Sequence, residues 1–195
     1  MTRLLIATTN PGKQREFRRL LAHLPAELVV PADLGINLDV VEPYDTYAAN
    51  AKAKAVAYAA ASGVLTVADD SGIEVAALDW GPGVRSARWG GPDKAASLVE
   101  ALAGTTDRRA RMVCALAIAN SGDPDAVELF TGIVDGEVAA APRGTGGFGY
   151  DPIFLLPRGL TTAELPEGEK DALSHRGRAV AAATPRLLEL LDAAH

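Results

Sequence analysis

IATTNPGKQREFRRLL, residues 6–21, contains the change from an apolar strand to an amphipathic helix that decides the fold class. Residues 3–9 are expected to form a buried strand, Asn10 suits the N-cap position, and Pro11 suits the first helical position. The apolar residues that follow recur at i, i+3, i+4 and i+7 and predict one buried helix face: Phe17, Leu20, Leu21 and Leu24.

Outward from this stretch, strand and helix signals alternate. Further strands are expected at residues 27–31, 64–68, 110–120 and 126–134, the last two joined by the turn-like residues 121–124. Helices are expected at residues 45–62, 92–103 and 174–194, and residues 142–149 form a loop rich in Pro and Gly. Alternation in the first third followed by a hairpin predicts an α/β fold with a mixed β-sheet flanked by helices.

The composition bounds the class of protein. A chain of 195 residues with 48% hydrophobic residues fits a single domain over residues 1–195. Its formal net charge of −6 disfavours broad nucleic-acid binding. Cys114 is the one cysteine, so no internal disulfide forms, and we expect it to be a small buried side chain. Because no apolar run approaches the ~20 residues of a membrane span, a cytoplasmic protein without membrane contact is expected.

The turn before the first helix has the features of an anion site. If Asn10 caps the helix, backbone N–H groups and the positive end of the helix dipole face the turn. Gly12 allows close approach of a ligand, and Lys13 adds a full charge in the first turn. The stretch therefore predicts phosphate binding, with an ordinary capped helix and a solvated lysine as the alternative.

Carboxylates gather near this position in the predicted sheet. Asp69 and Asp70 are expected where a buried strand ends, and Glu42 precedes the second helix. Carboxylates beside a phosphate site suit Mg²⁺, although a solvated Asp-Asp-Ser-Gly turn is the alternative. Asn50 and Lys54 share one helix face, from which Lys54 reaches a phosphate unless it is simply exposed.

Two later stretches suit a flat base. In residues 143–152, Phe148 and Tyr150 interrupt four glycines, so a ring can stack on a base while Asp151 reads its edge; the alternative is a tight loop anchored by aromatics. In residues 169–179, basic side chains cluster at a helix start, where Ser174 is the expected cap: Lys170, His175 and Arg176. Together the five stretches predict a ligand with a polyphosphate, a divalent metal and a base.

Five motifs, in order along the chain, resemble the inosine triphosphate pyrophosphatase family, also called the Ham1-like family. They are TTNPGK (8–13), ADDSGIEV (68–75), GPGVRSARWGG (81–91), GTGGFGYDPIF (144–154) and LSHRGRA (173–179). The resemblance implies Mg²⁺-dependent hydrolysis of ITP, dITP and XTP to the monophosphate and pyrophosphate. It also implies an elongated α/β fold with two lobes around a cleft, and a homodimer.

The resemblance also assigns roles, residue by residue. Asp70 would accept a proton and, with Glu42, bind the metal, while Lys54 would hold phosphates. The other residues it implies for substrate binding are Thr8, Thr9, Asn10, Pro11, Gly12, Lys13, Ser71, Phe148, Gly149, Tyr150, Asp151, Lys170, His175 and Arg176. Asp69 would orient a lysine or assist.

The chain departs from the family pattern at three places, the first of which is Val41, where a second acidic residue is usual before Glu42. Ala49 stands where Glu is usual, and Val84-Arg85 replaces an aromatic position of some relatives. Two other functions remain open at this point. One is a Maf-like pyrophosphatase for modified nucleotides, which the SHR and FGYD motifs disfavour. The other is a nucleotide-binding protein without turnover, which the acidic residues disfavour.

Overall fold

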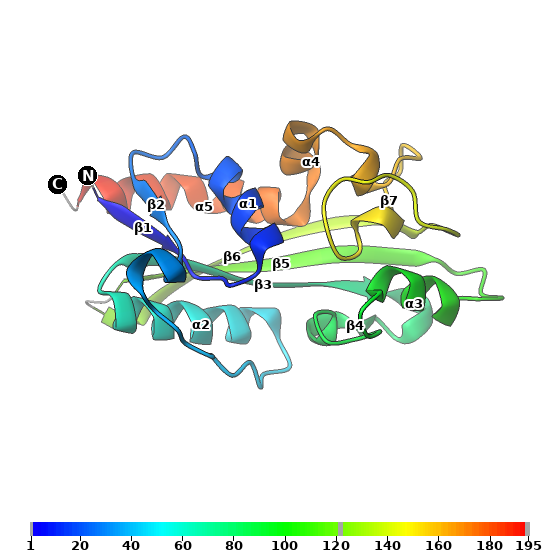
Figure 1. The fold of residues 1–195 in the computed structure, drawn as a ribbon, viewed down its shortest axis with the longest axis horizontal. Coiled ribbons are helices and arrows are strands. Elements are labelled where there is room, and N and C mark those ends of the chain that lie inside the picture. The colour runs from blue at the N-terminus through cyan, green and yellow to red at the C-terminus, as the bar shows by residue number, and fades with distance from the viewer. Residues whose placement is uncertain (1, 121–122, 194–195) are drawn as a thin grey trace. The chain divides into compact units, whose positions relative to one another are not determined.

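The computed structural model describes residues 2–120 and 123–193. In chain order its helices and strands are β1 (Arg3–Ile6), α1 (Pro11–Leu20), β2 (Glu27–Val29), α2 (Tyr47–Ser62), β3 (Leu65–Val75), β4 (Gly81–Pro82), α3 (Lys94–Ala101), β5 (Arg109–Asn120), β6 (Asp123–Val138), β7 (Phe154–Leu155), α4 (Glu167–Leu173) and α5 (His175–Asp192). Figure 1 shows these elements along the chain.

The strands form a mixed sheet in the order β2-β1-β3-β5-β6-β7, with β4 paired to β3. β1 runs parallel to β2 and to β3, whereas β4 is antiparallel to β3 and β7 is antiparallel to β6. The predicted α/β fold with a mixed sheet and flanking helices is confirmed. The cleft and the elongated outline implied by the resemblance stay predictions.

The chain divides into two compact units. Unit 1 comprises Met1–Asp70, Cys114–Gly132 and Arg178–His195, and unit 2 comprises Ser71–Val113 and Ile133–Gly177. Each unit has its own hydrophobic core, and the long strands β3, β5 and β6 contribute residues to both. The expectation of a single domain over residues 1–195 stays a prediction.

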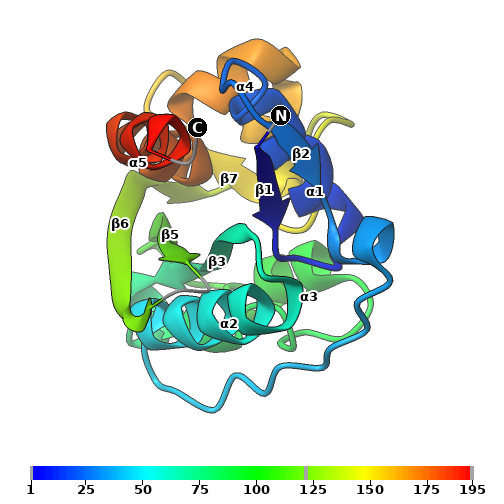
Figure 2. The same cartoon turned by 90° about the vertical axis from the view of Figure 1, so that its left-hand side faces the viewer.

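In unit 1, α1 and α5 lie on one face of the sheet and α2 lies on the other (Figures 1 and 2). The core between α1, α5 and the strands is built from the periodic residues of α1 and the alternating residues of the strands. Its largest fully buried members include Leu4, Ile6, Phe17, Leu21 and Leu116. Phe17, Leu21 and Leu24 are buried as their spacing predicted, but α1 ends at Leu20, so Leu21 and Leu24 pack into the core from the segment that follows the helix.

In unit 2, α3 and α4 lie on opposite sides of the strands (Figure 1). The core of this unit contains Ile73, Leu98, Leu102, Ile153 and Phe154, each of which is essentially inaccessible to solvent. These residues come from β3, α3, the segment that follows α3, and the segment at β7. The core therefore anchors the loop of residues 142–149 at its C-terminal end.

Several predicted boundaries were wrong: the strand predicted at residues 3–9 ends at Ile6, and the strand predicted at residues 27–31 ends at Val29. β3 does not end at residue 68 but continues to Val75, because Ile73 and Val75 alternate into the core of unit 2. α3 begins at Lys94 and not at residue 92, since the Asp93 side chain accepts a hydrogen bond from the N–H of Ala96 and caps the helix. β6 extends to Val138, four residues beyond the predicted strand end at residue 134.

Other local predictions were confirmed. Asn10 caps α1 with Pro11 as its first residue, and α2 ends at Gly63 in the left-handed conformation with φ of 67°. Ser174 accepts a hydrogen bond from the N–H of Gly177 at the start of α5. The helix α4, which contains Lys170, was not predicted. The predicted turn residues Ser121 and Gly122 lie outside the described residues.

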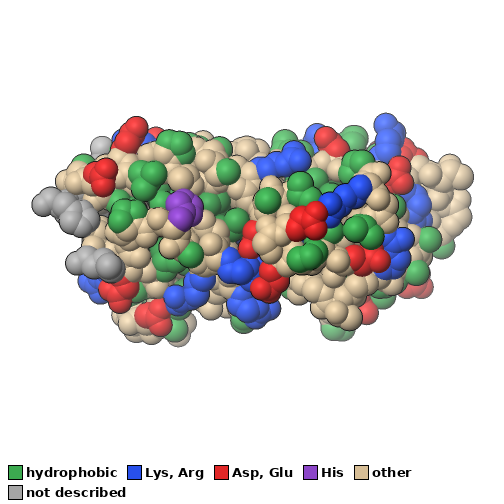
Figure 3. All heavy atoms as spheres, turned by 90° about the horizontal axis from the view of Figure 1, so that it is seen from above, with side chains coloured by type: hydrophobic (Ala, Val, Ile, Leu, Met, Phe, Trp, Pro, Cys, Tyr) green, Lys and Arg blue, Asp and Glu red, His purple; other side chains and the backbone are tan. Residues whose placement is uncertain are grey.

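The surface gives little further guidance to function. On the face shown in Figure 3, Lys and Arg side chains lie interspersed with Asp and Glu, as on an ordinary solvated surface. Across residues 2–120 and 123–193, none of the helices combines the length and the apolar character that a bilayer crossing requires. Several charged side chains are instead buried within the fold, among them Asp69, Asp70, Asp151, Lys170 and Arg176.

Candidate active site

The N-terminus of α1 is held by its own cap. The Asn10 Oδ1 accepts hydrogen bonds from the N–H groups of Gly12 and Lys13, at 2.8 and 3.1 Å, and the Thr8 Oγ1 accepts one from the Asn10 N–H at 3.2 Å. The expectation that these N–H groups face a ligand freely was therefore wrong for Gly12 and Lys13. The charge available at this turn is that of the Lys13 side chain.

Lys13 reaches from α1 to the first aspartate of β3. Its Nζ lies 3.0 Å from the Oδ1 of Asp69, whose side chain is 0% exposed, while the Lys13 side chain is 15% exposed. The Sγ of Cys114, on β5, lies 3.8 Å from the Oδ2 of Asp69 and donates to it. Cys114 is buried, as expected, but its contact with Asp69 was not predicted.

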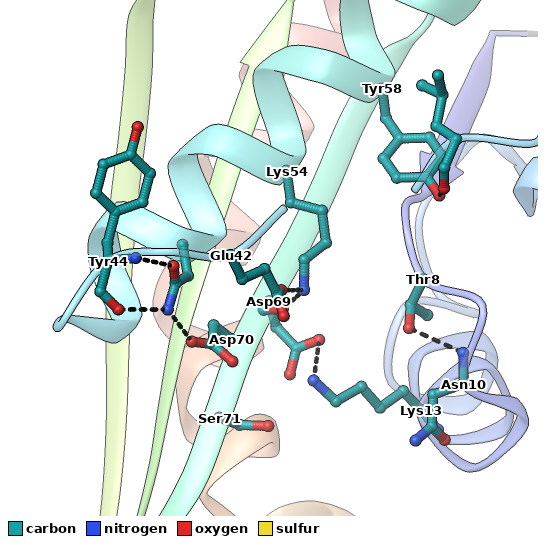
Figure 4. Close-up of polar contacts among 12 residues, drawn as sticks. Thr8, Asn10, Lys13, Glu42, Tyr44, Lys54, Tyr58, Asp69, Asp70 and Ser71 are labelled. Carbon is teal, nitrogen blue, oxygen red and sulfur yellow. Dashed lines mark hydrogen bonds and ion pairs between the residues drawn. The ribbon is translucent and has the colours of Figure 1, made fainter. Parts of the chain in front are cut away.

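Lys54 approaches the same aspartate from α2 (Figure 4). Its Nζ donates to the backbone carbonyl of Asp69 at 2.8 Å and forms an ion pair with Glu42. Burial lowers the pKa of Lys54, but the neighbouring carboxylates of Asp69, Glu42 and Asp70 outweigh this and hold that pKa above its ordinary value. Lys54 therefore carries its positive charge at neutral pH.

Asp70 faces the other side of the sheet. Its Oδ2 accepts a hydrogen bond of 3.0 Å from the Nδ2 of Asn50, on α2. Successive residues of a strand point to opposite faces, so Asp69 meets Lys13 of α1 whereas Asp70 meets Asn50 of α2. Burial raises the pKa of Asp70 above its usual value, although the hydrogen bond from Asn50 and the charges of Lys13 and Lys54 oppose the shift.

These five side chains, Lys13, Glu42, Lys54, Asp69 and Asp70, are called the unit 1 cluster. Within the described part of the chain, no three His, Cys, Asp or Glu side chains are arranged as a ready-made metal site. Mg²⁺ usually binds through one or two carboxylates together with substrate phosphates and water, and it prefers hard oxygen ligands. The carboxylates of Asp70 and Glu42 are oxygen donors of this kind, and both lie in unit 1.

A second group of charged side chains surrounds the Phe148 ring in unit 2. The Lys170 Nζ lies 5.4 Å and the Arg176 Cζ 5.8 Å from the centre of this ring. Arg176 is buried and its Nη2 donates to the Ser71 Oγ at 2.9 Å. His175, also buried, precedes Arg176 at the start of α5. Phe148, Asp151, Lys170, His175 and Arg176 are called the unit 2 cluster.

Asp151 supports the loop that carries Phe148. Its Oδ2 accepts from the Phe148 N–H and from the Lys170 Nζ, each at 2.6 Å, and its Oδ1 accepts from the Thr162 Oγ1 at 2.9 Å. A Cβ at Gly147, where φ is +70°, would lie 2.1 Å from the Asp151 Oδ2, so glycine is required here. The Asp151 carboxylate is thus engaged within the protein.

Tyr150 is directed into the core of unit 2. Its hydroxyl donates to the backbone carbonyl of Ser86 at 2.9 Å, and burial raises its pKa to about 12. The Ser86 Oγ in turn accepts from the Ile73 N–H at 2.9 Å. Tyr150 and Ser86 therefore tie the loop 142–149 and the GPGVRSARWGG motif to β3, and this tertiary link was not predicted from the sequence.

The model of the Ham1 family matches residues 4–186 of this chain. The chain belongs to the Ham1 family. It is 43% identical over 196 residues to a protein of Parasynechococcus marenigrum named dITP/XTP pyrophosphatase, with 99% of this chain and 98% of that protein covered. It is 45% identical over 196 residues to a Ralstonia nicotianae protein of the same name, with coverage of 96% and 97%.

Solved structures of the Ham1 family have the same fold. The structure of a HAM1 protein from Coxiella burnetii superposes with a TM-score of 0.85 at 37% identity, covering 97% of this chain and all of that chain. A Ham1 protein from Staphylococcus aureus has a TM-score of 0.81 at 34% identity and is covered completely, as is this chain.

The fold brings most of the predicted side chains into the two clusters. Five lie in the unit 1 cluster and five in the unit 2 cluster, while Ser71 contacts Arg176. The predicted residues Thr9, Asn10, Pro11 and Gly149 are exposed to solvent. Asn50 and Thr162, whose hydrogen bonds orient Asp70 and Asp151, were not predicted as site residues.

Proposed function

We propose that this protein is a metal-dependent nucleoside triphosphate pyrophosphatase that removes non-standard purine nucleotides from the nucleotide pool. The observation that carries the proposal is the convergence of two lysines, from α1 and α2, on Asp69 of β3: its carboxylate pairs with Lys13 and its backbone carbonyl accepts from Lys54. Membership of the Ham1 family and the names of the relatives at 43–45% identity support it. The substrates would be ITP, dITP and XTP, and the products would be the monophosphate and pyrophosphate.

The unit 1 cluster would bind the triphosphate. Lys13 and Lys54 supply positive charge, which stabilises the charge that develops on phosphate oxygens as pyrophosphate leaves. Asp70 and Glu42 would hold Mg²⁺, which when bound neutralises phosphate oxygens and lowers the pKa of a water molecule. A water molecule would attack the α-phosphorus, and Asp70 would accept its proton.

The raised pKa of Asp70 suits this role. A general base works best when its pKa approaches the operating pH, and burial moves the pKa of Asp70 upward from the ordinary Asp value. Asp69 has a different position, since its carboxylate is fully buried against Lys13. We therefore assign proton transfer to Asp70 and the positioning of Lys13 to Asp69.

The unit 2 cluster would bind the base. The Phe148 ring offers a stacking surface, and Arg176 and His175 offer hydrogen-bond donors. Hypoxanthine and xanthine present a 6-oxo acceptor, whereas adenine presents a 6-amino donor, so donors at this position favour the oxo purines. Asp151 would act through Phe148 and Lys170, because its carboxylate is engaged with both.

The proposal is tested by measuring pyrophosphate release from ITP, XTP, dITP, GTP, ATP and TTP, each with and without Mg²⁺. Preferential release from ITP, XTP and dITP that requires Mg²⁺ supports the proposal. A preference for modified pyrimidine or methylated guanine nucleotides would instead support a Maf-like enzyme. Tight binding of these nucleotides without release of pyrophosphate would support a binding protein.

We further propose that the protein is a homodimer and acts in the cytoplasm, where the nucleotide pool lies. The dimer is what the family resemblance implies, and the cytoplasm is where the proposed substrates would occur. Light scattering of the purified protein measures the oligomeric state directly, and a molar mass close to 20.2 kDa would contradict the dimer.

A further inference from the structure

A buried carboxamide connects the two segments that carry the proposed metal ligands. Asn50, on α2, is 2% exposed. Its Oδ1 accepts from the Tyr44 N–H at 3.1 Å, and its Nδ2 donates to the Tyr44 carbonyl at 3.1 Å and to the Asp70 Oδ2 at 3.0 Å. Because a backbone N–H only donates and a carbonyl only accepts, the two bonds to Tyr44 determine which amide atom faces Asp70.

Tyr44 lies two residues after Glu42, in the segment that leads into α2. Asn50 therefore binds both the backbone of the segment that carries Glu42 and the carboxylate of Asp70. Glu42, Tyr44, Asn50 and Asp70 all belong to unit 1, so this connection lies within one compact part of the molecule.

We propose that Asn50 is a positioning residue that holds the Asp70 carboxylate and the Glu42 segment in the arrangement that binds a divalent cation. This inference rests on the proposed function and extends it to a residue outside the predicted site. The amide would keep one carboxylate oxygen of Asp70 turned toward α2 and would limit the movement of the Glu42 segment. Side chains that orient metal ligands in this way commonly affect metal affinity by about 10–100-fold.

A purely structural role accounts less well for this residue. The start of α2 is already capped, since the Thr46 Oγ1 accepts from the Ala49 N–H at 3.2 Å. An apolar side chain at this position would leave the buried Asp70 carboxylate without its hydrogen bond from α2, so the amide serves that carboxylate and not only the packing of the helix. The position holds an amide that makes three hydrogen bonds, one of them to a proposed metal ligand.

The test measures the binding of Mn²⁺, as a spectroscopic substitute for Mg²⁺, by the intensity of the EPR signal of free Mn²⁺. Asn50→Leu keeps the number and branching of the side-chain heavy atoms and removes all three hydrogen bonds. Thr66→Val is the matched control, because Thr66 is a fully buried polar residue of β3 whose Oγ1 donates to the Val64 carbonyl at 2.8 Å. Tyr44→Ala is a second control that keeps both backbone groups bonded to Asn50.

The inference predicts that Asn50→Leu raises the Kd for Mn²⁺ by about tenfold or more, while both controls stay within about twofold of the wild type. Thermal unfolding of all variants, measured without metal, shows whether the loss of affinity follows the loss of stability. An Asn50→Leu protein that is folded and binds Mn²⁺ as the wild type does would overturn the role of Asn50 and leave the proposed function standing. A wild type that binds no Mn²⁺ would overturn the metal site as well.

A measurement on the wild type keeps the inference testable if Asn50→Leu fails to fold. In ¹H–¹⁵N spectra, the side-chain amide resonances of Asn50 should shift as Mg²⁺ is added, because the acceptor of its Nδ2–H would become a metal ligand. The shift should saturate together with metal binding and be absent in Asp70→Asn. Asn50 resonances that stay unchanged at saturating Mg²⁺ would overturn the inference.

Discussion

The buried ion pair between Lys13 and Asp69 allows a sharp test of the unit 1 cluster. Replacing Lys13 with Met keeps the length of the side chain and removes its charge. The Asp69 carboxylate, which is 0% exposed, then loses a cation 3.0 Å away, although Lys54 and Cys114 remain nearby. The variant therefore tests whether the pair contributes to stability in addition to any contact with the substrate.

The expected loss follows from the geometry of the pair. At 3.0 Å the attraction between the charges is about 5 kcal/mol with an effective dielectric constant of about 20. Breaking a buried pair on one side usually costs about 3–5 kcal/mol, and the 15% exposure of Lys13 places this pair near the lower end. We expect the free energy of unfolding to fall by about 3 kcal/mol and the Tm to fall by about 6–12 °C.

The assay is urea unfolding at pH 7 of the wild type, Lys13→Met, Asp69→Asn and the double variant. Because the double variant buries no unpaired charge, its stability should return to within about 1 kcal/mol of the wild type. Its kcat/KM for ITP should nevertheless stay as low as that of Lys13→Met, since the phosphate contact is missing. Single losses that simply add in the double variant would refute the pairing, and a recovery of kcat/KM would refute the contact of Lys13 with phosphate.

Three other substitutions test the remaining assignments. Asp70→Asn should lower kcat for ITP by ~10²-fold or more. Because burial raises the pKa of Asp70, this variant should also have a higher Tm than the wild type at pH 7. The gain in Tm should disappear as the pH falls below the ordinary Asp pKa, where both side chains are neutral. Turnover within about tenfold of the wild type would contradict the assignment of Asp70 as the proton acceptor. Arg176→Lys should reduce kcat/KM for ITP and XTP by about 5- to 150-fold relative to ATP, whereas an equal fall for all three would show that Arg176 does not read the base. Gly147→Ala should lower the free energy of unfolding by at least ~1 kcal/mol, since φ is +70° and the new Cβ meets Asp151; an unchanged urea midpoint would show that the loop can rearrange.

Local chemistry explains why several elements were predictable from the sequence. The Asn10 cap, Pro11 at the start of α1, and Gly63 at the end of α2 depend on interactions within a few residues, and all three were confirmed. The spacing of Phe17 and Leu20 also predicted which side of α1 packs against the core, because one helix face must be buried against the sheet. Asn50 and Lys54, four residues apart, both reach the β3 aspartates, as a shared helix face requires.

The end of β3 depended instead on contacts far away in the sequence. Asp69, Asp70, Ser71 and Gly72 have the composition of a turn, and the sequence pattern placed a strand end there. The strand continues because Ile73 and Val75 bury their side chains in a core completed by residues of α3 and β7. Packing against distant residues thus outweighed the local preference, which is the usual reason that strand ends are mispredicted.

The separate roles of the two aspartates were likewise decided by tertiary structure. Neighbouring residues of a strand point to opposite faces, but only the positions of α1 and α2 show that Asp69 meets Lys13 and Asp70 meets Asn50. The sequence by itself determined which residue types were available: cations on two helices, paired carboxylates on a strand, and an aromatic loop rich in glycine. The structure decides which of these side chains form pairs, such as Lys13 with Asp69 in unit 1 and Asp151 with Lys170 in unit 2. The partners are far apart in the sequence, so the pairs form only once the sheet and its helices have packed.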